Sequence, residues 1–472
     1  MKYVIFAMSA FSVFPLAFLL SINPRWMKFA FWGMVASMCS YHRTAINFFS
    51  NETYRGSARG MEVSTVYILV LTVLLALRLR RQTGPHLPDV GFRLFALYFL
   101  LCLPSLFNAD SVLFSWFEVW KMLMLFLVYY TAYSYLDATG DVKSILTALS
   151  AFLVVNFLLV ALGHFTGVYQ PRGAFPHRNC MAMAMLLLGP VFFAAYLRSG
   201  IRSRFGLLCL LSFICAATST MWSYSRGAIM MTPVAYGIVA LACLAEKRRP
   251  LFRWLRILPL VGIGVVGLAY MLPRLVDRFV NAPKRSGDTR VELALCAREM
   301  IHAHPYFGVG INNWSLNMDA GAHPYVERAE ERLGTPLGDF GIVETVYLLV
   351  AAECGVPALL AMLAWFGWYW VSCVRLMRIF RMTPLFYIPA GLLGGLTANF
   401  LQSTLEWVLR QQLNLICLML MFAVISYLNA NWTRLAPKAA EEAREHERQR
   451  ALARKRRSAA RHGTVLGEVA TA

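Results

Sequence analysis

Three short basic clusters hold most of the residues of this chain that could bind or activate a ligand. The stretch RGAFPHRN contributes Arg172, His177 and Asn179, MWSYSRGAI contributes Arg226, and DTRVELA contributes Arg290. A guanidinium stays charged and offers forked N–H donors that match the oxygens of a phosphate. Together the clusters predict a site for a polyanion such as a lipid diphosphate. For Arg226 alone, a side chain that merely reaches from the membrane interface to water is an equally good interpretation.

A carboxylate follows these clusters along the chain. Glu344 and Tyr347 are three residues apart in IVETVYLLVAAECG, so they share one face of a helix. A carboxylate that faces basic groups can act as a general base toward a hydroxyl group. The alternative is a salt bridge to Arg290 or Arg226. Glu353 lies nine residues further on and would point to the opposite side of a regular helix.

The turn-rich stretch HPYFGVGINNWSL (304–316) lies between the arginines and the carboxylate. Asn312, Asn313 and Trp314 offer amide hydrogen bonds and an aromatic face, which suit a sugar, or they hold the turn. The histidines of this region have no acidic residue at ligand spacing, so we predict no metal site and expect no cofactor.

The chain of 472 residues is 58% hydrophobic and only 15% charged, whereas soluble domains carry about 25% charged residues. Its apolar residues come in blocks of about 20, the length that crosses a hydrocarbon core of roughly 30 Å. We therefore predict an all-α polytopic membrane protein with 12 or 13 transmembrane helices. The candidate spans are residues 3–21, 27–42 (short enough to be re-entrant), 62–79, 93–108, 112–136, 144–165, 180–197, 204–221, 227–245, 252–272, 343–374, 384–402 and 411–429.

Lysine and arginine gather in alternate connections, which predicts that these connections are cytoplasmic. The net charge of +20 is then mainly this bias, and nucleic-acid binding is the poorer interpretation. The opposite, outer side receives residues 166–179, 222–226 and 273–342. Within one span, Glu118 and Lys121 are three residues apart, and we favour a structural ion pair for them.

Four regions follow from this topology. Residues 1–272 form the N-terminal transmembrane helices, 273–342 a mostly helical outer loop, 343–429 the C-terminal transmembrane helices, and 430–472 a basic cytoplasmic tail. In the loop of about 70 residues, Asp288 is a candidate helix N-cap, and His304-Pro305 should end that helix. The sequence does not indicate an oligomeric state.

The order of these motifs resembles the O-antigen ligase and polysaccharide polymerase superfamily. The motifs are GxFxHxN (173–179), SRGA (225–228), an arginine-bearing loop helix, HPYFGVGINNW (304–314) and ETVYLLVAAECGVPALL (344–360). The resemblance covers roughly residues 95–430, and GVGINNW followed by YLxxxAExG is its most specific part.

The resemblance implies a GT-C-like membrane glycosyltransferase at the periplasmic face of a bacterial inner membrane. It would move glycan, without a metal, from an undecaprenyl-diphosphate-linked donor to a lipid or glycan acceptor. Arg226 and Arg290 match family arginines that hold the diphosphate. Where the family commonly has His-Asn, this chain has Glu344-Thr345, so Glu344 would have to replace the histidine as base.

Two distinctions stay open at this point. A ligase and a polymerase fit the motifs equally. A transporter or flippase of lipid-linked oligosaccharide is the alternative from another class, although transporters concentrate polar groups near the bilayer midplane.

Overall fold

The structure is a computed structural model that describes residues 2–80, 89–245, 255–262, 285–319, 323–337 and 341–437, with scattered residues from 264 to 276 and from 441 to 448. Most of the expected tail at 430–472 and much of the expected span at 252–272 lie outside the described residues.

The described elements are, in order, α1 (Lys2–Phe11), α2 (Val13–Ile22), α3 (Pro24–Ala36), η1 (Ser37–Ser40), α4 (Tyr41–Thr44), β1 (Ile46–Ser50), β2 (Gly60–Val63), α5 (Thr65–Leu79), α6 (Val90–Cys102), η2 (Leu103–Asn108), α7 (Val112–Thr139), α8 (Val142–Phe165), α9 (Arg178–Ser199), α10 (Arg204–Trp222), α11 (Arg226–Leu244), α13 (Arg285–Ala303), α14 (Tyr325–Leu333), α15 (Val346–Cys354), α16 (Val356–Ile379), η3 (Pro384–Phe386), α17 (Tyr387–Gln402), η4 (Val408–Arg410) and α18 (Gln412–Ala430).

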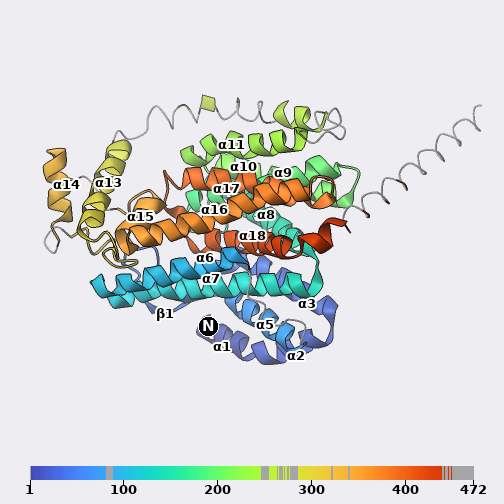
Figure 1. Ribbon diagram of the computed structural model, residues 1–472, viewed down its shortest axis with the longest axis horizontal. Coiled ribbons are helices and arrows are strands. Elements are labelled where there is room, and N and C mark those ends of the chain that lie inside the picture. Colours follow the sequence, from blue (N-terminus) through green and yellow to red (C-terminus); the bar gives the residue numbers. More distant parts are fainter. Residues whose placement is uncertain are drawn as a thin grey trace, which may run out of the picture.

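Long apolar helices dominate the chain, as its composition predicts. Within the described residues, nine helical segments are long and apolar enough to cross a membrane. They run side by side along the long axis of the molecule (Figure 1). The all-α, multi-pass membrane class is therefore confirmed.

Several of the 12 or 13 expected spans are shorter or broken. The first consists of two helices, α1 and α2, that meet at Ser12. α5 has 15 residues, which at 1.5 Å per residue is shorter than a hydrocarbon core of about 30 Å. The expected span at 343–374 is interrupted at Gly355, between α15 and α16.

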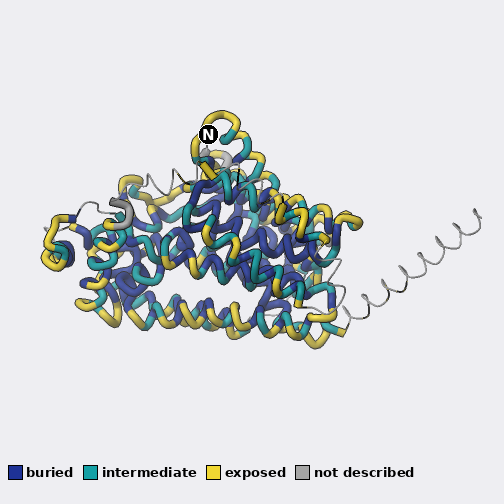
Figure 2. Tube along the Cα trace, turned by 90° about the horizontal axis from the view of Figure 1, so that it is seen from above, coloured by how far each residue is buried: buried dark blue, intermediate teal, exposed yellow. Residues whose placement is uncertain are grey.

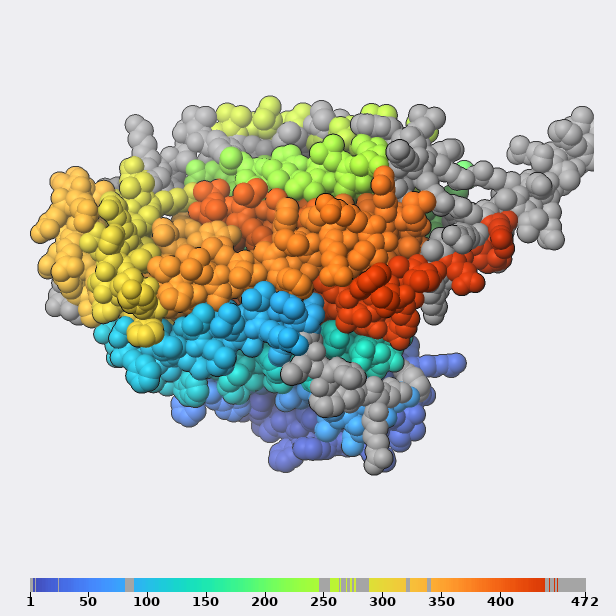
Figure 3. All heavy atoms as spheres, viewed as in Figure 1, coloured from blue at the N-terminus to red at the C-terminus, as the bar shows by residue number. Residues whose placement is uncertain are grey.

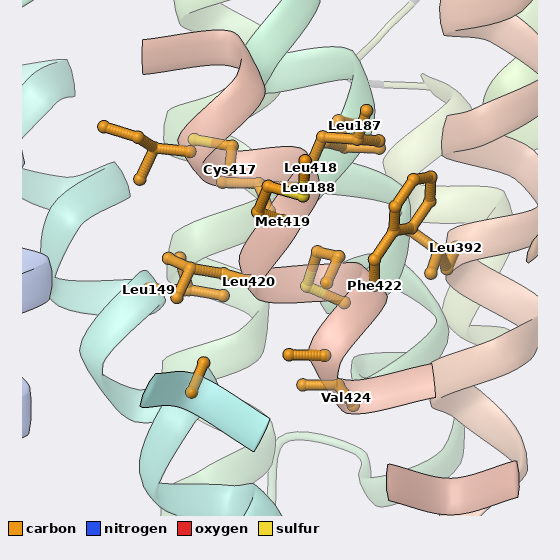
Figure 4. Packing of buried hydrophobic residues seen from close by; sticks show 14 of the residues in the cluster. Leu149, Leu187, Leu188, Leu392, Cys417, Leu418, Met419, Leu420, Phe422 and Val424 are labelled. Carbon is orange, nitrogen blue, oxygen red and sulfur yellow. The ribbon is translucent and has the colours of Figure 1, made fainter. Parts of the chain in front are cut away.

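The centre of the bundle is formed by α9 and α18. The most apolar part of α9 is buried along its whole length, and that of α18 nearly so. Figure 4 shows Leu418, Leu420 and Phe422 of α18 packed among leucines of α8, α9 and α17. The tube in Figure 2 shows the same pattern, with buried residues inside and exposed residues along the outer helices.

The outer loop has a small core of its own. α13 and α14 lie together at one end of the bundle (Figures 1 and 3), which we call the loop end. Leu293, Met300, Trp314 and Val326 are buried together there. α13 begins at Arg285, earlier than an N-cap at Asp288 would require; Asp288 instead lies in the first turn, where a carboxylate is favourable.

A short β-hairpin was not expected from the sequence. β1 and β2 pair antiparallel, with Ile46 opposite Val63 and Ser50 opposite Gly60. No role was expected from the sequence for the connection between the strands, residues 51–59. β1 lies toward the loop end (Figure 1).

Candidate functional site

Three of the expected site residues, Asn179, Arg290 and Glu344, meet a further carboxylate, Glu406, at the loop end. The guanidinium Nε of Arg290 forms a short ion pair with Glu344 Oε2. Beside them, the amide Nδ2 of Asn179 donates a 2.8 Å hydrogen bond to Glu406 Oε1. α13, α9 and the connections before α15 and after α17 thus bring together residues that are far apart in the sequence.

Glu406 has the protonation behaviour of an acid–base group. Its side chain is buried, in the connection between α17 and α18 and outside the membrane spans. Burial, and the negative charge of Glu344, raise the pKa of Glu406 to about 7, against the opposing effects of Asn179, Arg290 and Arg178. A carboxyl group with a pKa near neutrality can take up and release a proton at the working pH.

Hydrogen bonds join the segments of chain that carry the two carboxylates. Val346 N donates to Ser403 O at 3.1 Å, and Thr345 Oγ1 donates to the same oxygen at 3.3 Å. The residue after Glu344 is therefore tied to the segment that leads to Glu406. His177 caps α9, because its Nδ1 accepts from Asn179 N at 3.3 Å, so it positions Asn179 beside Glu406.

Arg226 lies at the start of α11, beside the end of α17. A Cβ added at Gly227 would be 3.6 Å from Cγ of Gln402. The amide group of Gln402 is fully buried, and within the described residues neither its nitrogen nor its oxygen has a hydrogen-bond partner; the hydroxyl of Ser225 is in the same condition. The first turn of a helix, with its free N–H groups, favours an anion. The start of α11 therefore brings Arg226 and Ser225 near Gln402, and the Gln402 amide and the Ser225 hydroxyl are buried polar groups.

A cavity of about 1150 Å³ lies next to the segments that carry these residues. His177, Ile342 and Trp407 line it, and each is close in sequence to Asn179, Glu344 or Glu406. Arg172, one of the expected binding residues, also lines it, while its Nη1 donates to Pro176 O at 2.9 Å.

The expected sugar-binding amides are used within the protein. Asn312 and Asn313 are fully buried. Asn312 Nδ2 donates to Ala58 O at 2.9 Å and to Phe114 O at 2.7 Å. Asn313 Nδ2 donates to Ser115 Oγ at 2.8 Å. These contacts give both side chains a structural role, the alternative left open for them by the sequence.

Trp314 and Tyr347 are engaged in the same way. The indole of Trp314 is buried in the loop core, and its Nε1 donates to Gly341 O at 2.9 Å. The hydroxyl of Tyr347 donates to Phe400 O at 2.8 Å and joins α15 to α17. Neither polar group points to the Glu406 cluster in this state.

The ion pair expected between Glu118 and Lys121 is confirmed at 2.6 Å, and it belongs to a larger buried network. Arg410 contacts Glu118 at 3.1 Å and Glu353 at 2.6 Å. Trp314 N donates to the other oxygen of Glu353 at 3.3 Å. The network joins α7, α15 and η4 beneath the loop end.

Sequence reasoning missed Glu406, Arg410 and the arginines of the hairpin. Glu406 was detectable as a carboxylate in an outer connection of only a few residues, between the spans at 384–402 and 411–429. Arg55 and Arg59 were detectable as two positive charges close together in NETYRGSARG, a polar segment between apolar blocks. Glu353 was expected to point away from Glu344; it pairs with Arg410 and lies in the last turn before the break at Gly355.

The fold and this cluster define a multi-pass membrane protein with an ionisable site at one end of its helix bundle. The family model of O-antigen ligase matches residues 211–363, less than half of the chain but including α11, α13 and α15. No curated protein matches the chain. Residues 211–363 are therefore similar to the O-antigen ligase family.

Proposed function

We propose that the chain is a membrane glycosyltransferase of the ligase or polymerase type, which takes glycan from an undecaprenyl-diphosphate-linked donor at the periplasmic face of the inner membrane. The observation that carries this proposal is the meeting of Glu406–Asn179 with Arg290–Glu344 at the edge of an O-antigen ligase domain. The C-terminal tail would then be cytoplasmic.

We assign the binding site of the donor diphosphate to the start of α11. When the bond between the sugar C1 and the diphosphate oxygen breaks, the electron pair goes to that oxygen. Arg226 and the buried amide of Gln402 would stabilise the developing charge, because fixed donors in a site with little water act strongly on it. Arg290 can add a second guanidinium if it leaves Glu344.

We assign to Glu406 the role of base, which removes the proton of the acceptor hydroxyl. The acceptor hydroxyl oxygen forms the new bond to C1 from the side opposite the leaving diphosphate, and its proton passes to the Glu406 carboxylate. Glu344, the base expected from the sequence, is engaged by Arg290. It is therefore assigned to positioning Arg290 and to raising the pKa of Glu406.

The test is the glycan profile of a strain that lacks the native gene and carries a variant. We expect Glu406→Gln and Arg226→Gln to abolish long or attached glycan while the protein still enters the membrane. Glu331→Gln, which changes an exposed carboxylate of α14, is the matched control and should restore the native profile. Normal glycan in Glu406→Gln and Arg226→Gln would show that the site is assigned wrongly.

The same strain separates the activities. Loss of long chains identifies a polymerase, and long chains that are made but not attached identify a ligase. Lipid-linked intermediates that accumulate only in the cytoplasmic leaflet would favour the flippase instead.

A further inference from the structure

The cavity beside Glu406 has a cationic wall that the reaction above does not use. α4 and the connection between β1 and β2 supply Arg43, Arg55 and Arg59 to it, and Arg172 lies on the same cavity. Glu62 is the one carboxylate among the lining residues described. Arg43, Arg55 and Arg59 lie outside residues 211–363, the segment that matches the family model.

Among the ion pairs of the described residues, none involves Arg43, Arg55 or Arg59. All three side chains are exposed, and they line the cavity of about 1150 Å³. Several positive charges around one concave space attract and concentrate an anion.

The arginine-bearing connection is held in place by the ligase domain. Ser57 Oγ and Ala58 N donate to Asn312 Oδ1 at 3.0 and 3.1 Å. The hydroxyl of Tyr54 donates to Asn312 O, and its ring stacks on Phe114 with 4.1 Å between centroids. Arg55 and Arg59 therefore extend from a fixed backbone, which reduces the entropy lost when they bind a ligand.

Another part of the cavity lining is apolar. Val155, Leu159 and Leu162 of α8 line it, and Val155 and Leu162 are 42% and 63% exposed, as residues that face lipid are. A cavity that is lined both by arginines and by exposed apolar side chains fits an amphiphile with an anionic headgroup. Its volume exceeds the range of about 300–1,000 Å³ typical of small-molecule pockets.

We propose that this cavity binds the acceptor, a lipid-anchored saccharide that carries phosphate groups, and presents its hydroxyl to Glu406. The inference rests on the proposed function, because it assigns the second substrate of that reaction. It separates two anion sites: the donor diphosphate at Arg226 and Gln402, and the acceptor phosphates at Arg43, Arg55, Arg59 and Arg172. The acceptor phosphates could belong to the diphosphate of a second lipid-linked repeat unit or to a phosphorylated glycolipid.

The experiment is a count of bound lipids on the full chain in neutral detergent, by native mass spectrometry. The probes are undecaprenyl diphosphate and a bis-phosphorylated glucosamine lipid, each titrated separately and then together. The variants are Arg55→Gln/Arg59→Gln, Arg226→Gln and, as matched control, Arg93→Gln, which changes an exposed arginine of α6 that does not line the cavity.

We expect two phosphate-bearing lipids per native chain. Two undecaprenyl diphosphates identify a lipid-linked repeat unit as acceptor, and one of each probe identifies a phosphorylated glycolipid. Arg55→Gln/Arg59→Gln should weaken one of the two sites about tenfold or more, since each lost guanidinium removes charge-assisted hydrogen bonds. Arg226→Gln should weaken only the other site, and Arg93→Gln neither.

Native binding of both lipids by Arg55→Gln/Arg59→Gln would overturn the acceptor site. That result would leave the proposed function standing if Glu406→Gln still abolishes the glycan. Normal glycan in Glu406→Gln would instead contradict the proposed function, whatever the lipid counts.

Discussion

At the scale of single residues, the site turns on the different surroundings of two neighbouring carboxylates. Glu344 is partly exposed and paired with Arg290. Glu406 is buried and accepts a hydrogen bond from the amide of Asn179. A shared site with two negative charges favours the protonated form of the more buried group, which is why the acid–base role passes to Glu406.

The raised pKa of Glu406 has a consequence for folding stability. Its value of about 7 lies above the ordinary value of 4.5, so the folded protein holds this proton more tightly than the unfolded chain. The stability therefore falls as the pH rises from 4.5 to about 7, by at most roughly 3 kcal/mol, and stays lowered above that. We expect Glu406→Gln to raise the unfolding temperature at pH 8 more than at pH 5.

The measurement is thermal unfolding of the purified protein in detergent at both pH values. Glu331→Gln, at an exposed position, should change little at either pH. An equal effect of Glu406→Gln at the two values would mean that the carboxyl group titrates normally.

At the scale of elements, residues 304–316 lock the loop onto the helix break at Gly355. Val309 N and Gly310 N donate to the carbonyls of Ala352 and Glu353 at 2.9 and 3.0 Å. Val356 N donates to Pro305 O at 2.8 Å. The end of α15 and the start of α16 thus find partners in this stretch for backbone groups that a broken helix leaves unpaired.

Gly308 shows how tight this contact is. Its φ is +68°, and an added Cβ would lie 2.3 Å from the carbonyl carbon of Glu353. We expect Gly308→Ala to destabilise the protein by about 2–5 kcal/mol, from the left-handed backbone and the overlap together. Gly334 has nearly the same φ, +70°, but open space around it, so Gly334→Ala should cost only about 1 kcal/mol.

Denaturant or thermal unfolding of the two glycine variants side by side separates backbone strain from crowding. Equal losses would show that the approach of Gly308 to Glu353 is not close in solution.

At the scale of the whole molecule, one buried network ties the hairpin, the bundle and the loop together. Arg410 pairs with Glu118 and Glu353, and Ser57 Oγ donates to Glu118 Oε2 at 2.9 Å. Buried ions are tolerated only when each has its partner, and removing one partner leaves an uncompensated charge.

We expect Arg410→Met to destabilise the folded protein by about 3–5 kcal/mol and to lower its yield from the membrane. Lys28 pairs with Asp141 at 3.0 Å, with side chains 41% and 35% exposed. Because solvent screens that pair, Lys28→Met should cost no more than about 1 kcal/mol. Similar unfolding temperatures for the two variants would show that the Arg410 network carries little stability.

The sequence predicted what depends on composition and local pattern. The long spans follow from blocks of apolar residues, and the end of α13 follows from His304-Pro305. The contact between Asn179 and Glu406 could not be predicted in this way. It depends on the packing of α9 with α17, which no local pattern encodes. The hairpin was missed because its strands are short and the connection between them is held by Asn312, far along the chain.

The central claim, that Glu406 is the base of a glycosyl transfer, is tested most directly by the pH dependence of transfer in proteoliposomes, with lipid-linked glycan isolated from the source cells. The account predicts that the native rate rises through a pKa of about 7. Glu406→Gln should lower the rate about 100-fold or more and remove that rise, whereas Glu344→Gln should keep a rise, shifted to lower pH because a neighbouring negative charge is gone. A Glu406→Gln variant with the native rate and the native pH profile would contradict it.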